Sequence, residues 1–206
     1  MNKIGNPGPL GLCGFALTTF VLSCYNAGIF GMSESSPVNV VVGAAVFYGG
    51  LAQGLAGMWE FVAGNTFGAT AFTSYAAFWL SYAAILIPWF GVGNAYASSP
   101  HLPQALAIFL LAWTIFTVML LVASLRTTLG LVTLFAFLSL TFLLLTIAEY
   151  KSNLRIKRAG GFFGVFTAAI AWYNALSGLL DAHDPPLISL PVGKIRSSSS
   201  PVDSLN

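Results

Sequence analysis

Residues 48–79 read Y-G-G-L-A-Q-G-L-A-G-M-W-E-F-V-A-G-N-T-F-G-A-T-A-F-T-S-Y-A-A-F-W, and this stretch decides the fold. It is apolar enough to lie in a lipid bilayer. Glycines at positions 43, 50, 57 and 64 recur every seven residues, a spacing that drifts only about 20° per step on a helix. The sequence therefore predicts one helix with a nearly straight glycine stripe, which would pack closely on a neighbouring helix.

Two polar residues, Gln53 and Glu60, lie in the first half of this stretch and are also seven residues apart. They form a second stripe about 60° from the first, which must face protein or water rather than lipid. Such a face is typical of the wall of a path through a membrane. Two plainer interpretations stay open: both residues hydrogen-bond between helices, or Glu60 reaches the membrane interface just before the turn at Gly64 and Asn65.

The composition is that of a membrane protein. Of 206 residues, 57% are hydrophobic and only 7% are charged, whereas a soluble domain carries about 25% charged residues. The formal net charge of +2 gives no reason to expect a nucleic-acid partner.

Six apolar stretches are each long enough to cross about 30 Å of hydrocarbon. They cover residues 10–30, 38–63, 71–87, 104–125, 129–148 and 160–180. We therefore expect an all-α integral membrane protein with six transmembrane helices around a central pore. Residues 1–9 form an N-terminal segment, 10–181 the six-helix domain and 182–206 a disordered, serine-rich tail. Residues 149–158 read as a charged loop. An even number of spans puts both termini on one side, and four Lys or Arg residues on each side leave the orientation undecided.

Two helix faces combine polar and aromatic side chains. In the first span, Phe15, Thr19, Ser23 and Asn26 are three or four residues apart and share a face. In the third, Tyr75, Trp79 and Tyr82 form an aromatic stripe, a pattern that more often indicates packing than function.

The sequence offers few groups for catalysis. It contains no glycine-rich phosphate loop, no metal-ligand cluster and no intramembrane Ser/His/Asp set. We therefore expect neither an enzyme nor a metal or cofactor site. A conduit lined by hydroxyls, amides and aromatic rings would suit a small solute that is neutral or weakly charged.

Two motifs carry a resemblance to a known family. They are N-P-G-P-L-G-L at residues 6–12, and F-Y-G-G-L-A-Q followed by G-N-T-F-G-x-T-A-F-T-S-Y-x-x-F-W within residues 47–79. Together, on six spans, they resemble the acetate uptake transporter family, which includes bacterial succinate–acetate permeases and fungal acetate and ammonium-export proteins. The resemblance covers residues 6–180. Gly8 is a departure, since the family usually has Ala there.

The resemblance implies a homo-hexamer in the plasma membrane, with one pore per protomer and both termini cytoplasmic. It also implies a pore constriction formed by Phe15, Tyr75 and Leu140. The expected polar lining comprises Thr19, Asn26, Gln53, Glu60, Asn65 and Thr66. The expected family motif comprises Asn6, Pro7, Pro9, Leu10 and Gly11. The implied partners are the lipid bilayer and acetate or a related small carboxylate.

The implied function is transport of acetate and other small monocarboxylates, with succinate as a further candidate, by a channel or a proton symporter. Two alternatives stay open: an exporter of ammonia or ammonium, and a membrane signalling protein that does not transport. Glu60 is either structural or couples a proton to the substrate.

Overall fold

The computed structural model describes residues 4–33, 35–182, 185, 188–193 and 195. Within these residues it is helical and has no β-strand. The long elements are α1 (Gly8–Ala27), α2 (Val41–Val46), η2 (Phe47–Ala52), α3 (Gln53–Val62), α4 (Thr66–Leu86), α6 (Leu102–Ser124), α7 (Leu129–Lys151) and α8 (Leu154–Leu180). Short turns of helix are η1 (Ile29–Gly31), η3 (Pro88–Phe90) and α5 (Val92–Ala95). The part of the chain that is described contains six helices long and apolar enough to span a membrane, with Val41–Val62 as one of them.

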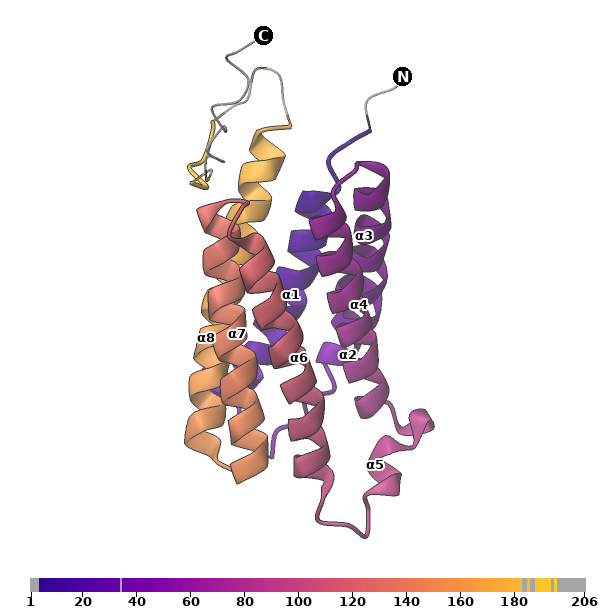
Figure 1. Cartoon of the computed structure of the whole chain (residues 1–206). Coiled ribbons are helices and arrows are strands. Elements are labelled where there is room, and N and C mark those ends of the chain that lie inside the picture. The colour runs from indigo at the N-terminus through magenta and orange to yellow at the C-terminus, as the bar shows by residue number, and fades with distance from the viewer. Residues whose placement is uncertain (1–3, 34, 183–184, 186–187, 194, 196–206) are drawn as a thin grey trace.

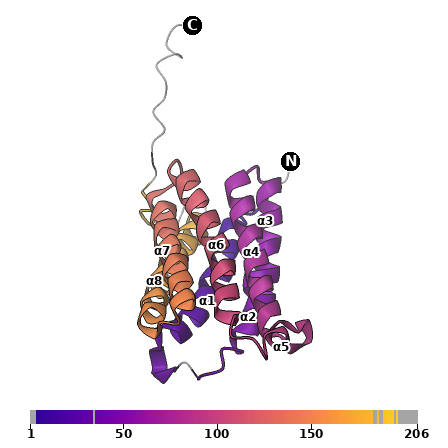
Figure 2. The same ribbon diagram turned by 60° about the horizontal axis from the view of Figure 1, so that its bottom comes forward.

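The helices run roughly parallel in one bundle, with α1 on the inside. Figure 1 shows α7 and α8 on one side of α1, the α2–α4 group on the other, and α6 running in front of α1. We call the end where α1 begins and α8 ends the terminal end. The opposite end, where α7 turns into α8, is the hairpin end. The segment that follows α1 crosses the hairpin end, as Figure 2 shows. The candidate site lies mainly between α1, α3, α4, α6 and α7, whose residues line it.

Local sequence signals explain several helix ends. Asn65 is the N-cap of α4, because its side-chain oxygen accepts a hydrogen bond from the Gly68 backbone N–H at 3.0 Å. α4 ends before Pro88, because the residue before a proline is driven out of the helical conformation, and Ile87 is extended. Asn6 accepts a hydrogen bond from the Gly8 N–H just before α1.

The second span is not the single regular helix that the glycine spacing predicts. The residues of η2 form a π-helical turn between α2 and α3. A π turn inserts one extra residue and so rotates everything beyond it around the axis. Gly50 and Gly57 do approach a neighbouring helix, but Gly43 faces open space and Gly64 lies beyond the end of α3. The predicted four-glycine stripe is therefore wrong.

The predicted charged loop is mostly helix. α7 continues to Lys151 and α8 begins at Leu154, so the turn consists of Ser152 and Asn153. Ser152 adopts a left-handed conformation, with φ of 47°, and Asn153 caps α8. Where the helices continue past the apolar region, Glu149 and Lys157 pair across the turn, with 2.9 Å between Oε1 and Nζ.

Part of the predicted disordered tail packs on the bundle. The carbonyl oxygens of Val192 and Gly193 accept hydrogen bonds from the Gly130 and Leu129 N–H groups at 3.0 and 2.7 Å. These N–H groups open α7 and have no partner within that helix. The prediction of disorder is therefore wrong for residues 188–193, while 183–184, 186–187, 194 and 196–206 lie outside the described residues.

Small residues bring α1 and α8 into close contact. Gly161 lies against the backbone of Ala27, and Gly164 lies against Ser23. A β-carbon at either glycine would overlap these neighbours. This approach places the polar face of α1 beside the core of the bundle.

Candidate functional site

Two aromatic rings form an apolar barrier in the middle of the bundle. Phe15 of α1 and Tyr75 of α4 are 5% and 3% exposed, and their ring centroids are 5.5 Å apart. The Tyr75 hydroxyl is held by the Thr117 hydroxyl of α6 at 2.9 Å. Further rings pack around Tyr75 from α6 and α7: Trp113, Phe116 and Phe135.

A cavity lies on each side of this barrier. The hairpin-end cavity has a volume of about 250 Å³, and the terminal-end cavity about 160 Å³. Phe15 is the residue that lines both of them. Tyr75 lines the terminal-end cavity, and Phe78, one turn further along α4, lines the hairpin-end cavity. The rings of Phe15 and Tyr75 thus separate two spaces aligned along the bundle.

The terminal-end cavity holds the polar residues of the opening stretch. Gln53 and Glu60, both after the π turn, are buried and line it together with Asn65. The Asn65 amide donates to Glu60 Oε2 at 2.8 Å. Neither the nitrogen nor the oxygen of the Gln53 amide has a hydrogen-bond partner among the described residues. A buried amide without partners is costly, and Gln53 lies in the wall of this cavity with both polar atoms of its amide buried.

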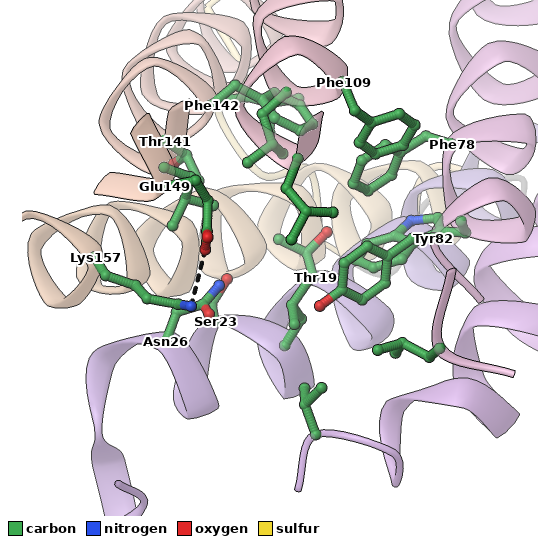
Figure 3. Close-up of a pocket in the computed structure, with 18 of the residues that line it drawn as sticks. Thr19, Ser23, Asn26, Phe78, Tyr82, Phe109, Thr141, Phe142, Glu149 and Lys157 are labelled. Carbon is green, nitrogen blue, oxygen red and sulfur yellow. Dashed lines mark hydrogen bonds and ion pairs between the residues drawn. The ribbon is translucent and has the colours of Figure 1, made fainter. Parts of the chain in front are cut away.

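The hairpin-end cavity, drawn in Figure 3, has polar groups on an aromatic wall. Thr19, Ser23 and Asn26 of α1 line one side of it. The Thr19 hydroxyl and the Trp79 indole Nε1 are buried, and neither is paired within the described part of the chain. Figure 3 shows the rings of Phe78, Phe109 and Phe142 on the opposite wall. Each cavity therefore offers unpaired hydrogen-bonding groups beside apolar surface.

An ion pair lies at the rim of the hairpin-end cavity. Figure 3 shows Glu149 and Lys157 joined beside Asn26 and Ser23. Both charged residues line the cavity. They bring charge to a space that is otherwise lined by neutral side chains.

The structure places most of the predicted site residues, but not all of them, in the walls of the two cavities. Eight of the predicted residues line one cavity or the other: Asn6, Phe15, Thr19, Asn26, Gln53, Glu60, Asn65 and Tyr75. Leu140 is 44% exposed and lines neither, so the prediction that it joins the constriction does not fit the structure. Leu138, two residues earlier, is 2% exposed and lines the hairpin-end cavity. The two positions lie about 200° apart on a helix, which puts them on opposite faces.

Other predicted residues support the site without lining it. Thr66 is exposed at the start of α4. Within the motif, Gly11 faces the ring of Phe72, and Pro9 packs against Gly178 at the end of α8. Pro7 and Leu10 also lie outside the residues that line the two cavities. These motif residues fix the start of α1 rather than contact the cavities.

Sequence reasoning missed several lining residues. The aromatic stripe of the third span favours a packing role for Trp79 and Tyr82, but both line the hairpin-end cavity. The run of charged residues predicts a loop for Glu149 and Lys157, but both line the hairpin-end cavity. Their opposite charges at the ends of consecutive spans were the signal that could have identified them.

The arrangement can bind and pass a small polar solute. Across the described residues, no three His, Cys, Asp or Glu side chains come together where they could hold a metal ion. The unpaired amide, hydroxyl and indole groups can donate hydrogen bonds to an anion or a neutral acid on either side of the barrier. The rings of Phe15 and Tyr75 between them are buried.

Comparison with known proteins identifies the family. The family model described as GPR1/FUN34/yaaH matches residues 1–195. The chain is 37% identical over 193 residues to the succinate-acetate/proton symporter SatP of Escherichia coli (strain K12), which covers 93% of this chain and 97% of that protein. It is 51% identical over 180 residues to ammonia transport outward protein 2 of Saccharomyces cerevisiae, which covers 87% of this chain. The chain spans 63% of that fungal protein's length, less than two thirds.

The fold agrees with a solved structure. The structure of the bacterial acetate channel SatP matches with a TM-score of 0.82 and 36% identity, covering 93% of this chain and all of that one. This match confirms the predicted all-helical membrane fold with six spans. The matches to transporters and a channel also support a role other than catalysis. By its sequence over residues 1–195 and by its fold, the chain belongs to the GPR1/FUN34/yaaH family.

Proposed function

We propose that the chain transports acetate and other small monocarboxylates, with succinate as a further substrate, across a membrane. The observation that carries this proposal is the pair of cavities, each with unpaired polar groups, separated by the rings of Phe15 and Tyr75. The names of the bacterial relatives, an acetate channel and a succinate-acetate/proton symporter, support it.

The substrate's two ends match the two kinds of lining. In the terminal-end cavity the Gln53 amide donates a hydrogen bond to a carboxylate oxygen, while the methyl group packs on apolar side chains. In the hairpin-end cavity the Thr19 hydroxyl and the Trp79 indole N–H take over this role. Hydrogen bonding on both sides offsets part of the large cost of moving a carboxylate out of water.

The barrier provides selectivity. A hydrated ion loses its water at the rings of Phe15 and Tyr75 and gains no polar partner there. Leu138, in place of Leu140, narrows the hairpin-end side of the same barrier. A small acid with an apolar body passes at lower cost because only its carboxyl group must be desolvated.

Glu60 has a positioning role in this proposal. Its carboxyl accepts a hydrogen bond from Asn65 and lies beside Gly8, so it joins the starts of α1 and α4. A proton symporter would instead use Glu60 to carry a proton with the substrate. Uptake by Glu60→Gln protein distinguishes the two roles.

The assembly and its placement are also proposals. We propose a homo-hexamer in the plasma membrane, with one pore per protomer and both termini in the cytoplasm. The apolar outer surface of α6 and α8, which exposes residues such as Ile115, Val122 and Phe166, supports contact with lipid or with neighbouring protomers. In this orientation the hairpin end faces outside.

The test is uptake of labelled acetate into liposomes that contain the purified protein, with and without a pH gradient. We expect uptake above empty liposomes, and faster, less selective uptake by Tyr75→Ala protein. Accumulation beyond equilibrium that needs the pH gradient identifies a symporter, and simple equilibration identifies a channel. Absence of acetate flux under both conditions refutes the proposal.

Export of ammonium is the second candidate. A fungal relative is named an ammonia transport outward protein, and stacked rings of Phe78, Tyr82 and Phe109 line the hairpin-end cavity. Aromatic faces attract cations such as ammonium. Flux of methylammonium without flux of acetate would favour this function.

A further inference from the structure

Positive charge gathers at the hairpin end of the bundle. Four of the eight Lys and Arg residues lie between α7 and the first turn of α8: Lys151, Arg155, Lys157 and Arg158. Glu149 is the acidic side chain that pairs with one of them. Glu34, which the sequence places in the segment after α1, lies outside the described residues. The described charge at this mouth is therefore mainly positive.

A third cavity of about 130 Å³, which we call the vestibule, lies at this mouth. Lys157 and Arg158 line it together with Ser33, Ser36 and Tyr25, and none of the described residues that line it is acidic. Four residues line both the vestibule and the hairpin-end cavity: Asn26, Val38, Tyr82 and Lys157. The two spaces therefore adjoin, and Lys157 lies where they meet.

The ion pair at this junction has little value for stability. The side chains of Lys157 and Glu149 are 33% and 19% exposed, and such pairs near water contribute only about 0–1 kcal/mol. The pair does fix the Lys157 ammonium at the rim of the hairpin-end cavity. There the Glu149 carboxylate lies 2.9 Å from the ammonium.

We propose that Lys157 and Arg158 form a recruitment site for the carboxylate of the substrate, and that Glu149 competes with the substrate for Lys157. This inference rests on the proposed transport of monocarboxylates. An arriving anion binds Arg158 in the vestibule and then exchanges with Glu149 at the Lys157 ammonium. From there it reaches Asn26 and Ser23 on the polar face of α1.

Replacing either partner of the ion pair should then change the half-saturation concentration for acetate, in opposite directions for the two partners. Lys157→Gln removes the cation and leaves Glu149 to repel the substrate, so the half-saturation concentration for acetate rises. Glu149→Gln frees Lys157, so the same concentration falls. We expect changes of about two- to fivefold in each direction, the size of a partly exposed charge interaction. A purely structural ion pair would give both variants the same change, because either one breaks it.

The first experiment measures the concentration dependence of acetate uptake into liposomes at low and high salt. Arg155→Gln is the matched control, because Arg155 is an exposed cation on the first turn of α8 and does not line the three cavities. Opposite shifts for the two variants, lost near 1 M salt where the screening length is about 3 Å, support the proposal. Equal shifts, or the same shift in the control, overturn it.

A second experiment does not depend on acetate transport. Ser33→Cys places a thiol in the vestibule of a protein that carries Cys13→Ala and Cys24→Ala. The rates of its reaction with an anionic and a neutral thiol reagent are compared. We expect Lys157→Gln to lower the anionic-to-neutral ratio and Glu149→Gln to raise it. An unchanged ratio overturns the recruitment site even if acetate is transported. If the anionic-to-neutral ratio shifts as expected but the protein shows no acetate flux, the proposed function is refuted and the vestibule is still an anion-binding site.

Discussion

Replacing Gln53 with leucine should improve the stability of the protein and impair its transport. Gln53 is fully buried, and both polar atoms of its amide are unpaired among the residues that the structure describes. An unpaired buried polar group costs about 1–3 kcal/mol. Because the terminal-end cavity beside the amide has room for water, the lower end of this range applies. We therefore expect Gln53→Leu to raise the free energy of unfolding by about 1 kcal/mol.

The effect on transport follows from the lost donor. A hydrogen bond to a charged group contributes about 1.5–3 kcal/mol, and each 1.4 kcal/mol is a factor of about ten in affinity. The half-saturation concentration for acetate should therefore rise by about 10- to 100-fold. A change in this direction, in a protein that is more stable than the original, cannot come from partial unfolding.

The assay pairs thermal unfolding in detergent with labelled acetate uptake into liposomes. Thr73→Val is the matched control, because the Thr73 hydroxyl is also buried and unpaired but Thr73 does not line the three cavities. This control should gain stability and keep its uptake. Unaltered uptake by Gln53→Leu protein would refute the role of the amide in the substrate path. A destabilised Gln53→Leu protein would refute the argument from unpaired groups.

Three further predictions concern the barrier, the packing and the proton. Leu138→Ala should lower the free energy of unfolding by about 2–5 kcal/mol and speed acetate flux. Leu140→Ala, on the outer face, should change the free energy of unfolding by less than about 0.5 kcal/mol. Unfolding and acetate uptake measurements on both variants test this difference. Gly161→Ala should lower the free energy of unfolding by about 1–3 kcal/mol, because the new β-carbon meets the α1 backbone. Gly43→Ala, which faces open space, should raise the free energy of unfolding by up to about 1 kcal/mol. Equal melting temperatures of the two variants would contradict the close packing of α1 and α8. Glu60→Gln should keep acetate uptake and any accumulation driven by a pH gradient, and loss of accumulation with retained equilibration would identify Glu60 as the proton carrier.

The number and position of the six spans could be predicted because long apolar runs, Asn65 and Pro88 are local signals. The pairing of Gln53 with Glu60 on one face could also be predicted, since both lie in α3 on the same side of the π turn. The face of Leu140 could not, because α7 is apolar all round and its sequence does not distinguish inside from outside.

Long-range contacts explain the other errors. The π turn has no local sequence signal, and it moved Gly43 out of the predicted stripe. The ion pair of Glu149 and Lys157 depends on two helices meeting, so the charges alone indicated a loop. Residues 188–193 are held by the start of α7, a contact between distant segments that composition cannot reveal.

The π turn at Phe47–Ala52 gives the second span an unusual tolerance to change in chain length. Deleting one residue from a regular helix shifts all that follows by about 100°. Here a deletion at the exposed Leu51 would leave a regular α-helix in place of the π turn. The packing faces would be kept: Ala45 and Gln53 would then be seven residues apart on a regular helix, a spacing that returns within about 20° of the same direction, so Ala45 would still face the core while Gln53 faces its cavity. The π turn thus holds one surplus residue without changing the directions in which α2 and α3 pack.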